Sequence, residues 1–565
     1  DAPLRRLIGP PTRADAGDLA LPCFQLAKAA KRNPAQLASD LIPVVEAALP
    51  GITVVAVGPF LNISFPPALV AERLLGVLRS DPVAPLRCPE QQRTVCVDFS
   101  SPNIAKHLAF HHIRSTGIGN ALAQCYAAAG WRVVRINFLG DWGTAFGRLI
   151  AGWKREGLSR ADLDAAADPV AFFNDIYVRI SRAGKDDPTV AEEAREWSRR
   201  CEADDPEALE LWQIIRDASL AAAREIYALL GIEFDDWRGE AHYRKHGAAV
   251  VGELEAAGLL CEDQGAKVVD LKDMGFKKPC LILRSDGGSL YATRDLAACE
   301  DRHQRYGFDR ALYVVDLGQS LHFKEWFAVA ARLGKPYAGE LRHVGFGVIQ
   351  MWNDEEQRWA KTATRNGVPM MLMDVLREAI DRARAVVEEK NPDLPEAEKA
   401  AVAEAVGLGA VLFNDLRNNR KGDIRFRFED ALNMQGDTGP YLQYAHARLC
   451  SIERRFAAAH GAPGEPDPTQ LDRDEEKAVL LAIARLQRAL SDVVSNDDPS
   501  QLANALLALA AATSSWLTLG NRDRSARVLC EQSDRATARV ALVAAVRAAL
   551  AEGLRLLGIR APQRM

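Results

Sequence analysis

Three histidines lie close together in one segment, where imidazole rings are able to bind a metal ion or hydrogen-bond an anion. His107 and His111 are four residues apart, and His112 follows directly. On a helix, residues four apart share a face, so His107 and His111 have the spacing of two metal ligands. No carboxylate or cysteine stands on the same stretch to complete a ligand set. We therefore predict no metal site there.

Two polar loops follow predicted strands. Residues 94–99 alternate between apolar and polar side chains and end in Ser100-Ser101-Pro102-Asn103, after which a helical pattern runs to about Ala129. The next strand, Arg132–Phe138, ends in Gly140-Asp141-Trp142-Gly143. Strand, loop, helix and strand in this order predict a parallel βαβ sheet, in which ligands bind at the carboxyl ends of the strands. Both loops are therefore expected to carry chemistry.

A run of basic and aromatic side chains occupies residues 414–430. Its cations interleave with Phe426 and Phe428, a composition that suits contact with RNA. A solvated helix face is the alternative interpretation of such a run. Because the net charge of the chain is −5, any nucleic-acid surface has to be a local basic face on an acidic body. The cations are Arg417, Arg420, Lys421, Arg425 and Arg427.

The elements around these residues predict a multidomain α/β protein. Its 565 residues suggest about three to five domains. Residues 1–80 have the pattern of a small α+β unit, with a helical pattern over 19–49 and strands over 52–65. Residues 151–270 are mostly helical and read as an insertion. Strand patterns resume at Pro279–Ser285 and Ala311–Asp316, and Thr293 is the expected N-cap of the helix between them. The chain is helical from about Ala401.

Composition excludes several classes of protein. Charged residues make up 26% and hydrophobic residues 48%, which excludes collagen, simple disorder and coiled-coil arrays. No window holds eighteen uncharged apolar residues in a row, so we expect no membrane span. The ten cysteines form no CxxC pair, which argues against a zinc ribbon and favours a reducing compartment. No targeting sequence is visible, and we expect a cytoplasmic protein.

Several sequence blocks resemble class I arginyl-tRNA synthetases, and they follow the order of that family along nearly the whole chain. Any one block is weak, but the ordered set is specific. The blocks are VDFSSPNIAKHLAFHHIRSTGIGNAL (97–122), NFLGDWGTAFGRLI (137–150), RSDGGSLYATRDLAA (284–298), YVVDLGQSLHFKEWFAVAARLG (313–334), GDTGPYLQYAHARLCSI (436–452), the C-terminal segment 541–565, and PTRADAGDLALPCFQLAKAAKRNPAQLA (11–38).

The resemblance implies both a fold and a reaction. The expected fold is an N-terminal tRNA-binding α+β domain over 1–85, a Rossmann-type α/β catalytic domain over 93–425 with a helical insertion at about 151–270, and an all-α anticodon-binding domain over 426–565. The implied reaction joins L-arginine to ATP as arginyl-adenylate and then transfers arginine to the 3′ end of tRNA-Arg. In this family, activation generally requires bound tRNA.

By resemblance, five side chains are expected to bind arginine. A guanidinium group is planar, and carboxylates and carbonyls in a bidentate arrangement recognise it best. Two of the five lie at or after the first strand, two are four residues apart around a helix start, and one follows a later strand. An ion pair with an arginine, or a helix cap, is the alternative role for such residues. They are Asp98, Asn103, Tyr291, Asp295 and Gln319.

The ATP motif departs from the family pattern HxGH. The family's imidazoles hydrogen-bond the phosphates of ATP, and its glycine lets adenine approach the backbone. Here Ala109 replaces the first His, His111 replaces the Gly, and His112 is the second His. His111, or alternatively His107, is able to supply the missing imidazole. By resemblance, ATP also contacts residues of both loops and of a later helix, namely Ser100, Pro102, Ala109, Gly140, Asp141 and His322, with Lys106 as a further catalytic side chain.

A second ATP element is expected at WAKTATRNG (359–367), where the family carries KMSKS or a degenerate KTRxG. The lysine of this element neutralises charge on the leaving pyrophosphate. Two extra residues leave both Lys361 and Arg365 as candidates for that role. Mg²⁺ is expected to accompany ATP and to be held mainly by phosphates, with no structural metal bound by the protein.

By resemblance, tRNA-Arg contacts the basic run and the start of the helical domain, and more weakly the N-terminal domain. A monomer with no membrane partner is expected. The predicted tRNA-contacting residues are Phe60, Asn62, Arg417, Arg420, Lys421, Tyr441, Gln443, Tyr444, Arg448 and Met565.

Two rival functions remain open at this point. One is a synthetase-like paralogue that transfers arginine to an acceptor other than tRNA; such a protein is expected to lose the anticodon-binding segments, which are present here. The other is a catalytically inactive RNA-binding module that has lost adenylation. Such a module is expected to lose the arginine-binding residues, which all remain.

Overall fold

The structure is a computed structural model that describes residues 7–11, 13, 16–284, 291–353, 357–361, 364–365 and 368–565. The chain packs into two compact units. The first unit consists of residues 1–85, 448–486 and 508–549. The second unit consists of residues 86–447, 487–507 and 550–565, and it contains the predicted catalytic sheet.

The N-terminal part of the first unit is a three-stranded antiparallel sheet with the strand order β1-β3-β2. The strands predicted over 52–65 are present as β2 and β3, which pair antiparallel. The helical pattern predicted from Leu19 is wrong for its first four residues, because Leu21 pairs with Leu61 as a strand. Short apolar runs do not distinguish strand from helix. The elements are β1 (Leu19–Pro22), α2 (Phe24–Ala30), α3 (Pro34–Ala48), β2 (Thr53–Val57), β3 (Phe60–Ser64) and α4 (Pro67–Ser80).

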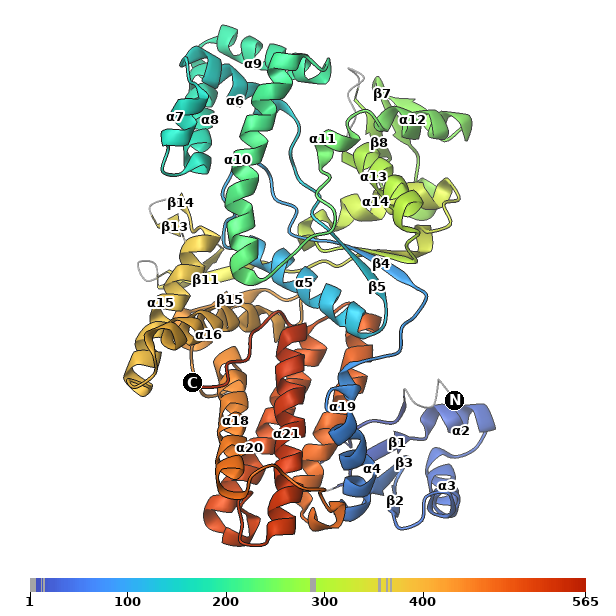
Figure 1. Ribbon diagram of the computed structural model, residues 1–565. Helices are drawn as coiled ribbons and strands as arrows, with labels where there is room; N and C mark the ends of the chain where they lie inside the picture. The colour runs from blue at the N-terminus through green and yellow to red at the C-terminus, as the bar shows by residue number, and fades with distance from the viewer. Residues whose placement is uncertain are drawn as a thin grey trace. The chain divides into compact units, whose positions relative to one another are not determined.

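A four-stranded parallel sheet forms the centre of the second unit, with the order β10-β9-β4-β5 (Figure 1). The predicted Rossmann-type fold is confirmed. Because all four strands are parallel, their carboxyl ends and the loops that follow them share one edge. The strands and the helices between them are β4 (Thr94–Asp98), α5 (His112–Ala128), β5 (Arg132–Ile136), α13 (Tyr291–Tyr306), β9 (Arg310–Tyr313), α14 (Ser320–Arg332) and β10 (Leu341–His343).

Helix α5 begins later than its sequence pattern predicts. It starts at His112, and residues 99–111 form an irregular loop instead. Ser100, Ser101 and Ala105 have φ angles of 69°, 45° and 62°, in the left-handed region that side chains rarely adopt. Tertiary contacts override the helical pattern, and strain of this kind concentrates at functional sites. His107 and His111 are therefore not on one helix face.

The predicted insertion is mostly helical (cyan to green in Figure 1). Trp153, Phe173 and Ile176 are among the buried side chains of its core. The insertion ends in an antiparallel sheet that includes β8, so the prediction that β8 resumes the parallel sheet is wrong. The elements are α6 (Thr144–Arg155), α7 (Arg160–Ala165), α8 (Pro169–Asp186), α9 (Pro188–Glu202), α10 (Pro206–Leu230), α11 (Glu240–Tyr243), α12 (Gly247–Ala256), β6 (Leu260–Asp263), β7 (Ala266–Val269) and β8 (Cys280–Leu283).

The helix after β8 also starts differently from its prediction. Thr293 is not the N-cap, because α13 begins at Tyr291, and the Thr293 hydroxyl donates to the carbonyl of Ile282, 2.5 Å away. Beyond the parallel sheet, β11 pairs with β12 and with β15. The elements of this part of the chain are β11 (Ile349–Asn353), β12 (Arg358–Lys361), β13 (Thr364–Arg365), β14 (Val368–Pro369), α15 (Leu372–Lys390), α16 (Glu396–Leu416), β15 (Ile424–Phe426) and α17 (Phe428–Ala431).

The C-terminal part is all-helical, as predicted. Gly558 has φ 75° and ends the last helix, because glycine adopts this conformation without steric cost. By length and composition α20 is apolar enough to cross a membrane. Leu502, Leu506, Leu509 and Trp516 on this helix are nevertheless fully buried, as in a core helix. The helices are α18 (Gly439–His460), α19 (Asp474–Asn496), α20 (Ser500–Arg522) and α21 (Ser533–Leu556).

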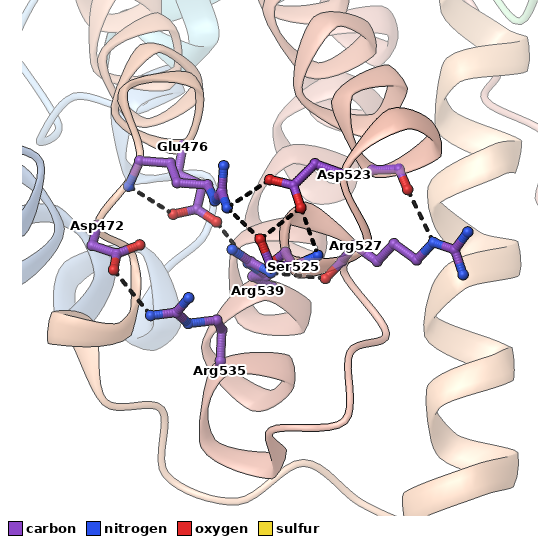
Figure 2. A network of polar contacts seen from close by, with 9 residues as sticks. Asp472, Glu476, Asp523, Ser525, Arg527, Arg535 and Arg539 are labelled. Atoms are coloured by element: carbon purple, nitrogen blue, oxygen red, sulfur yellow. Dashed lines mark hydrogen bonds and ion pairs between the residues drawn. The ribbon is translucent and has the colours of Figure 1, made fainter.

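A buried polar network stabilises the helical part of the first unit (Figure 2). Nε of Arg539 lies 2.6 Å from Oε1 of Glu476, and both side chains are 0% exposed. Nη1 of Arg539 donates to the carbonyls of Ser525 and Arg527, at 2.6 and 2.9 Å. The backbone N–H of Arg473 donates to the second oxygen of Glu476, at 3.1 Å. This network fixes the segment between α20 and α21 against α19.

Candidate active site

A cavity of about 380 Å³ opens at the carboxyl ends of β4 and β9. One wall is polar and comes from the loop after β4 and the start of α5. The other wall is mostly apolar and comes from the residues after β9 and from residues 346–349. The polar lining is Ser100, Ser101, His111, His112, Arg114, Ser115 and Asp316, and the rest is Val314, Val315, Phe346, Gly347, Val348 and Ile349.

Two stacked imidazole rings lie at this cavity. The ring centroids of His111 and His112 are 4.2 Å apart and the planes are inclined by 29°. Nδ1 of His112 lies 3.0 Å from the carbonyl of Ala109, which therefore accepts its proton. Burial, together with His111, lowers the pKa of His112 to about 4. Burial also lowers the pKa of His111, against the attraction of Asp316. Both shifts disfavour the protonated form of the ring.

The loop after β4 is held by buried hydrogen bonds. Oγ of Ser100 lies 2.7 Å from the hydroxyl of Tyr227, and Thr116 donates to the same oxygen at 2.9 Å. The N–H of Ser100 donates to Ser115, whose hydroxyl in turn donates to the carbonyl of Val314, at 2.6 Å. These contacts join the ends of β4 and β9, and they stabilise the left-handed backbone of the loop.

The two polar loops predicted from the sequence do meet. Asn103 and Gly140 form a bridge between the loops, and the N–H of Gly140 donates to the carbonyl of Pro102 at 3.0 Å. A Cβ atom on Gly140 would lie 2.3 Å from Oδ1 of Asn103, so a side chain at this position would displace the amide of Asn103. Asn103 itself is exposed. The contact places Asn103 at the edge of the sheet where the strands end.

Asp98 is buried at the end of β4. Its Oδ2 lies 2.8 Å from Nη1 of Arg302 on α13, and its Oδ1 accepts from Ser101 at 2.7 Å. Burial raises the pKa of Asp98 against the attraction of Arg302, and the nearby carboxylate of Asp295 raises it further. Arg302 has no local signal in the sequence that would predict this pairing.

Helices α13 and α14 bring Asp295 and His322 together. Nε2 of His322 lies 2.6 Å from Oδ2 of Asp295, and both side chains are partly exposed, at 28% and 21%. Burial lowers the pKa of His322, but the hydrogen bond to Asp295 raises it by more, so the pKa of His322 lies above its ordinary value. Tyr291, one turn before Asp295, is 66% exposed, and Gln319 is also exposed. These side chains are open to solvent and able to meet a ligand.

Asp141, predicted to contact ATP, is instead buried inside the protein. Its Oδ2 lies 2.9 Å from Nε of Arg216 on α10, and its Oδ1 accepts from the N–H of Ala241 on α11. Its carbonyl accepts from Nε1 of Trp212 at 2.7 Å. These contacts join the loop after β5 to the insertion, and they occupy both carboxylate oxygens.

Sequence patterns gave no indication of Glu240, which adds a carboxylate beside the predicted arginine-binding residues. Its Oε2 lies 2.8 Å from Nη1 of Arg294, and both side chains are about 15% exposed, at 14% and 15%. Burial raises the pKa of Glu240 to about 7 against the attraction of Arg294, and Asp295 and Asp141 raise it further. The pair fixes the first turn of α13, which carries Tyr291 and Asp295.

The raised pKa of Glu240 predicts a pH-dependent stability. Its ordinary value is 4.5, so the folded protein binds the proton more tightly than the unfolded chain. The free energy of unfolding should therefore fall as pH rises from about 4.5 to about 7, with roughly 2–3 kcal/mol due to this group. In urea unfolding at pH 5 and pH 8, Glu240→Gln should reduce the difference between the two pH values by that amount.

Glu255→Gln is a matched control for this measurement, because Glu255 is half exposed and pairs with Lys267 on the surface. Its variant should keep the pH dependence of the parent protein. An unchanged pH dependence in Glu240→Gln would contradict the assignment of this effect to Glu240.

Other predicted residues are placed unevenly. His107 pairs with Asp168 at 2.9 Å and does not line the cavity. Among the described residues, no group of three or more His, Cys, Asp or Glu is placed to hold a metal ion. Lys106 is exposed, with its ammonium 5.9 Å from the ring of Tyr177. The backbones of Lys361 and Arg365 pair in β12 and β13, and their side chains lie outside the described part.

Three of the predicted tRNA-contacting residues are buried. The guanidinium of Arg420 donates to the carbonyls of Gly345 and Asp497, at 2.6 and 2.8 Å. Nε2 of Gln443 donates to the carbonyls of Ala405 and Arg560, and Asn62 is 7% exposed in β3. The remaining residues reach the surface at least in part, and they are Phe60, Arg417, Lys421, Tyr441, Tyr444, Arg448 and Met565.

A buried ion pair stabilises one wall of the cavity. The sequence patterns did not indicate this pair. Nη2 of Arg114 lies 2.9 Å from Oδ1 of Asp415, and Nε lies 3.1 Å from the same oxygen. Nη1 of Arg114 also donates to the carbonyl of Gly422 at 3.0 Å. Helix α5 is thereby fixed to α16 and to the loop before β15. The contact orients the first turn of α5, where His112 lies.

Comparison with known proteins agrees with this sheet and cavity. Residues 77–428 match the family model of class I (R) tRNA synthetases, catalytic domain, so the sheet and its cavity are those of a class I aminoacyl-tRNA synthetase. Residues 442–565 match the DALR anticodon binding domain, and residues 3–65 match the arginyl tRNA synthetase N-terminal domain. The chain belongs to the arginyl-tRNA synthetase family.

Individual relatives cover the full length. The chain is 39% identical over 564 residues to arginine–tRNA ligase 2 of Bacillus anthracis, covering 99% of this chain and 95% of the relative. It is also 39% identical to arginine–tRNA ligase of Streptococcus thermophilus, over 100% and 96% of the two chains. The solved arginyl-tRNA synthetase of Thermus thermophilus superposes with a TM-score of 0.82 at 26% identity, over 99% and 96% of the chains.

Proposed function

We propose that this chain activates L-arginine with ATP in the cavity at the carboxyl ends of β4 and β9 and then transfers the arginyl group to the 3′ end of tRNA-Arg. Membership of the family makes the chain an arginine–tRNA ligase. One observation carries the assignment of the site: a cavity of about 380 Å³ is lined by His112, and the partly exposed Asp295 lies on a neighbouring helix, α13. Both features lie at the edge where α/β sheets bind ligands.

Arginine is proposed to bind between Asn103 and the first turn of α13. Asp295, Tyr291 and Gln319 offer a carboxylate, a phenol and an amide that are accessible from solvent. A guanidinium would replace His322 as the partner of Asp295, because a carboxylate binds the planar fork through two hydrogen bonds. Asp98 is proposed to contribute negative charge from beneath, with Arg302 balancing part of it.

ATP is proposed to place its phosphates at the first turn of α5. The N-terminus of a helix favours negative charge, and His112 is among the residues that line the cavity there. Because Nδ1 of His112 donates to Ala109, its Nε2 has to gain a proton before it donates to a phosphate oxygen. Lys361 or Arg365, and Lys106, are proposed to add positive charge, and Mg²⁺ is proposed to enter with ATP.

tRNA-Arg is proposed to contact the surface-accessible members of the predicted set. Exposed Lys421 lies in the loop after α16, and Tyr444 on α18 is 45% exposed. Arg420 and Gln443 are proposed to support this surface from inside, since their polar groups already donate hydrogen bonds to backbone carbonyls. Asn62 is buried in β3, so its contribution to tRNA binding is proposed to be indirect. The enzyme is proposed to act as a cytoplasmic monomer.

The proposed function is tested by arginine-dependent exchange of pyrophosphate into ATP, with and without tRNA-Arg, alongside charging of that tRNA. We expect exchange that depends on tRNA, together with charging. Absence of both activities from folded protein that still binds tRNA would overturn the proposal and favour a paralogue without adenylation.

A further inference from the structure

The cavity contains a side chain where the HxGH pattern has a glycine. His111 takes that position, so an imidazole ring replaces a hydrogen atom at the entrance to α5. His111 is one of the residues that line the cavity. A ring in this place either obstructs the base of ATP or supports it.

The contacts of His111 favour a ring that binds the base of ATP over one that obstructs it. One face of its ring is covered by His112, with 4.2 Å between the ring centroids. The residue as a whole is nevertheless exposed, although it lines the cavity. An exposed imidazole at the cavity offers a surface on which a flat ligand could stack. Heteroaromatic rings stack well on such a surface, because both partners have π faces.

Near His111, the other residues that line the cavity suit the adenine base of ATP better than a phosphate group. Val315, Phe346 and Val348 are among its apolar lining. Gly347 packs its backbone against the loop before β15, where an added Cβ would lie 2.5 Å from the carbonyl of Gly422. The carboxylate of Asp316 is close enough to His111 to influence its charge, and it would repel a phosphate. An uncharged, flat group is favoured beside His111.

We propose that His111 binds the adenine ring of ATP by stacking, and thus replaces the backbone contact that a glycine would allow. The inference rests on the proposed function, since it assigns the base end of the same cavity. His112 then remains the phosphate-binding imidazole, and His111 determines the affinity for the nucleoside part of the substrate.

The test compares His111→Gly, His111→Ala and His111→Phe in pyrophosphate exchange at varied ATP concentration. Stacking of a base on an aromatic side chain is worth about 1–3 kcal/mol, so loss of the ring should raise the KM for ATP roughly 5- to 150-fold. We expect kcat to change by less than about threefold, and His111→Phe to restore the KM of the parent enzyme. An unchanged or lower KM in His111→Gly would overturn the proposal, because the ring would then be idle or obstructive.

Calorimetric binding of ATP and of inorganic triphosphate separates this proposal from the proposed function. His111→Gly should weaken ATP but leave triphosphate binding unchanged, even if the protein proved unable to activate arginine. Equal weakening of both ligands would overturn the stacking role and assign His111 to the phosphates. His107→Ala is the matched control, because His107 lies in the same loop but outside the cavity and should leave both affinities intact. Thermal unfolding of each variant verifies that it is folded.

Discussion

Asp295→Asn is expected to reduce kcat/KM for arginine in pyrophosphate exchange by roughly 100- to 1,000-fold. Removing one charge of a close pair in a binding site costs about 3–4 kcal/mol, much of it from the partner charge that is left without a counter-ion. Asp295 is 21% exposed, so its pairing with a guanidinium would be only partly screened by water. Asp295→Ala, which removes the polar group altogether, should abolish arginine activation.

The same variants should bind tRNA-Arg with unchanged affinity, because Asp295 belongs to α13 and lies outside the predicted tRNA-contacting set. Asp301→Asn is a matched control: Asp301 stands on the same helix, is also 21% exposed and pairs with Arg305. It should retain nearly full activity. Unchanged arginine activation in Asp295→Asn would refute the assignment of this pocket.

The second large effect is expected on stability. Arg539→Met should lower the free energy of unfolding by about 3–5 kcal/mol, because it leaves the carboxylate of Glu476 buried without a counter-charge. Both side chains are 0% exposed, so water cannot replace the lost partner. The carbonyls of Ser525 and Arg527 would lose their donor as well (Figure 2). Urea unfolding followed by circular dichroism measures the change.

The double variant Arg539→Met with Glu476→Leu distinguishes the pair from simple loss of packing. Replacing both charges by apolar side chains removes the unpaired carboxylate, so much of the lost stability should return. Arg160→Ala is the exposed control, since Arg160 and Asp164 form a surface pair at 62% and 60% exposure, and it should cause no measurable change. Equal destabilisation in the single and double variants would contradict the charge argument.

Local patterns predicted the catalytic sheet well because they depend on neighbours in the chain. Strands β4, β5 and β9 and the loops after them have the alternation and polar endings of a parallel sheet. The pattern of β8 is similar, yet β8 pairs antiparallel with β7, since alternation reports burial and not the identity of the partner strand. The helix pattern before His112 failed for a related reason: contacts with Ser115, Tyr227 and Gly140 hold that segment as a loop.

The amino-acid sequence by itself determined the family, the order of the domains, and the types of side chain available for arginine and ATP. Only the tertiary structure decided which of them are accessible. In the folded protein Asp141 is buried and pairs with Arg216, whereas His111 is exposed and lines the cavity. The tertiary structure also joined Glu240 to Arg294 across 54 positions, and Arg114 to Asp415 across 301. Side chains so far apart share no periodic signal, because only the packing of their helices brings their charges within hydrogen-bonding distance.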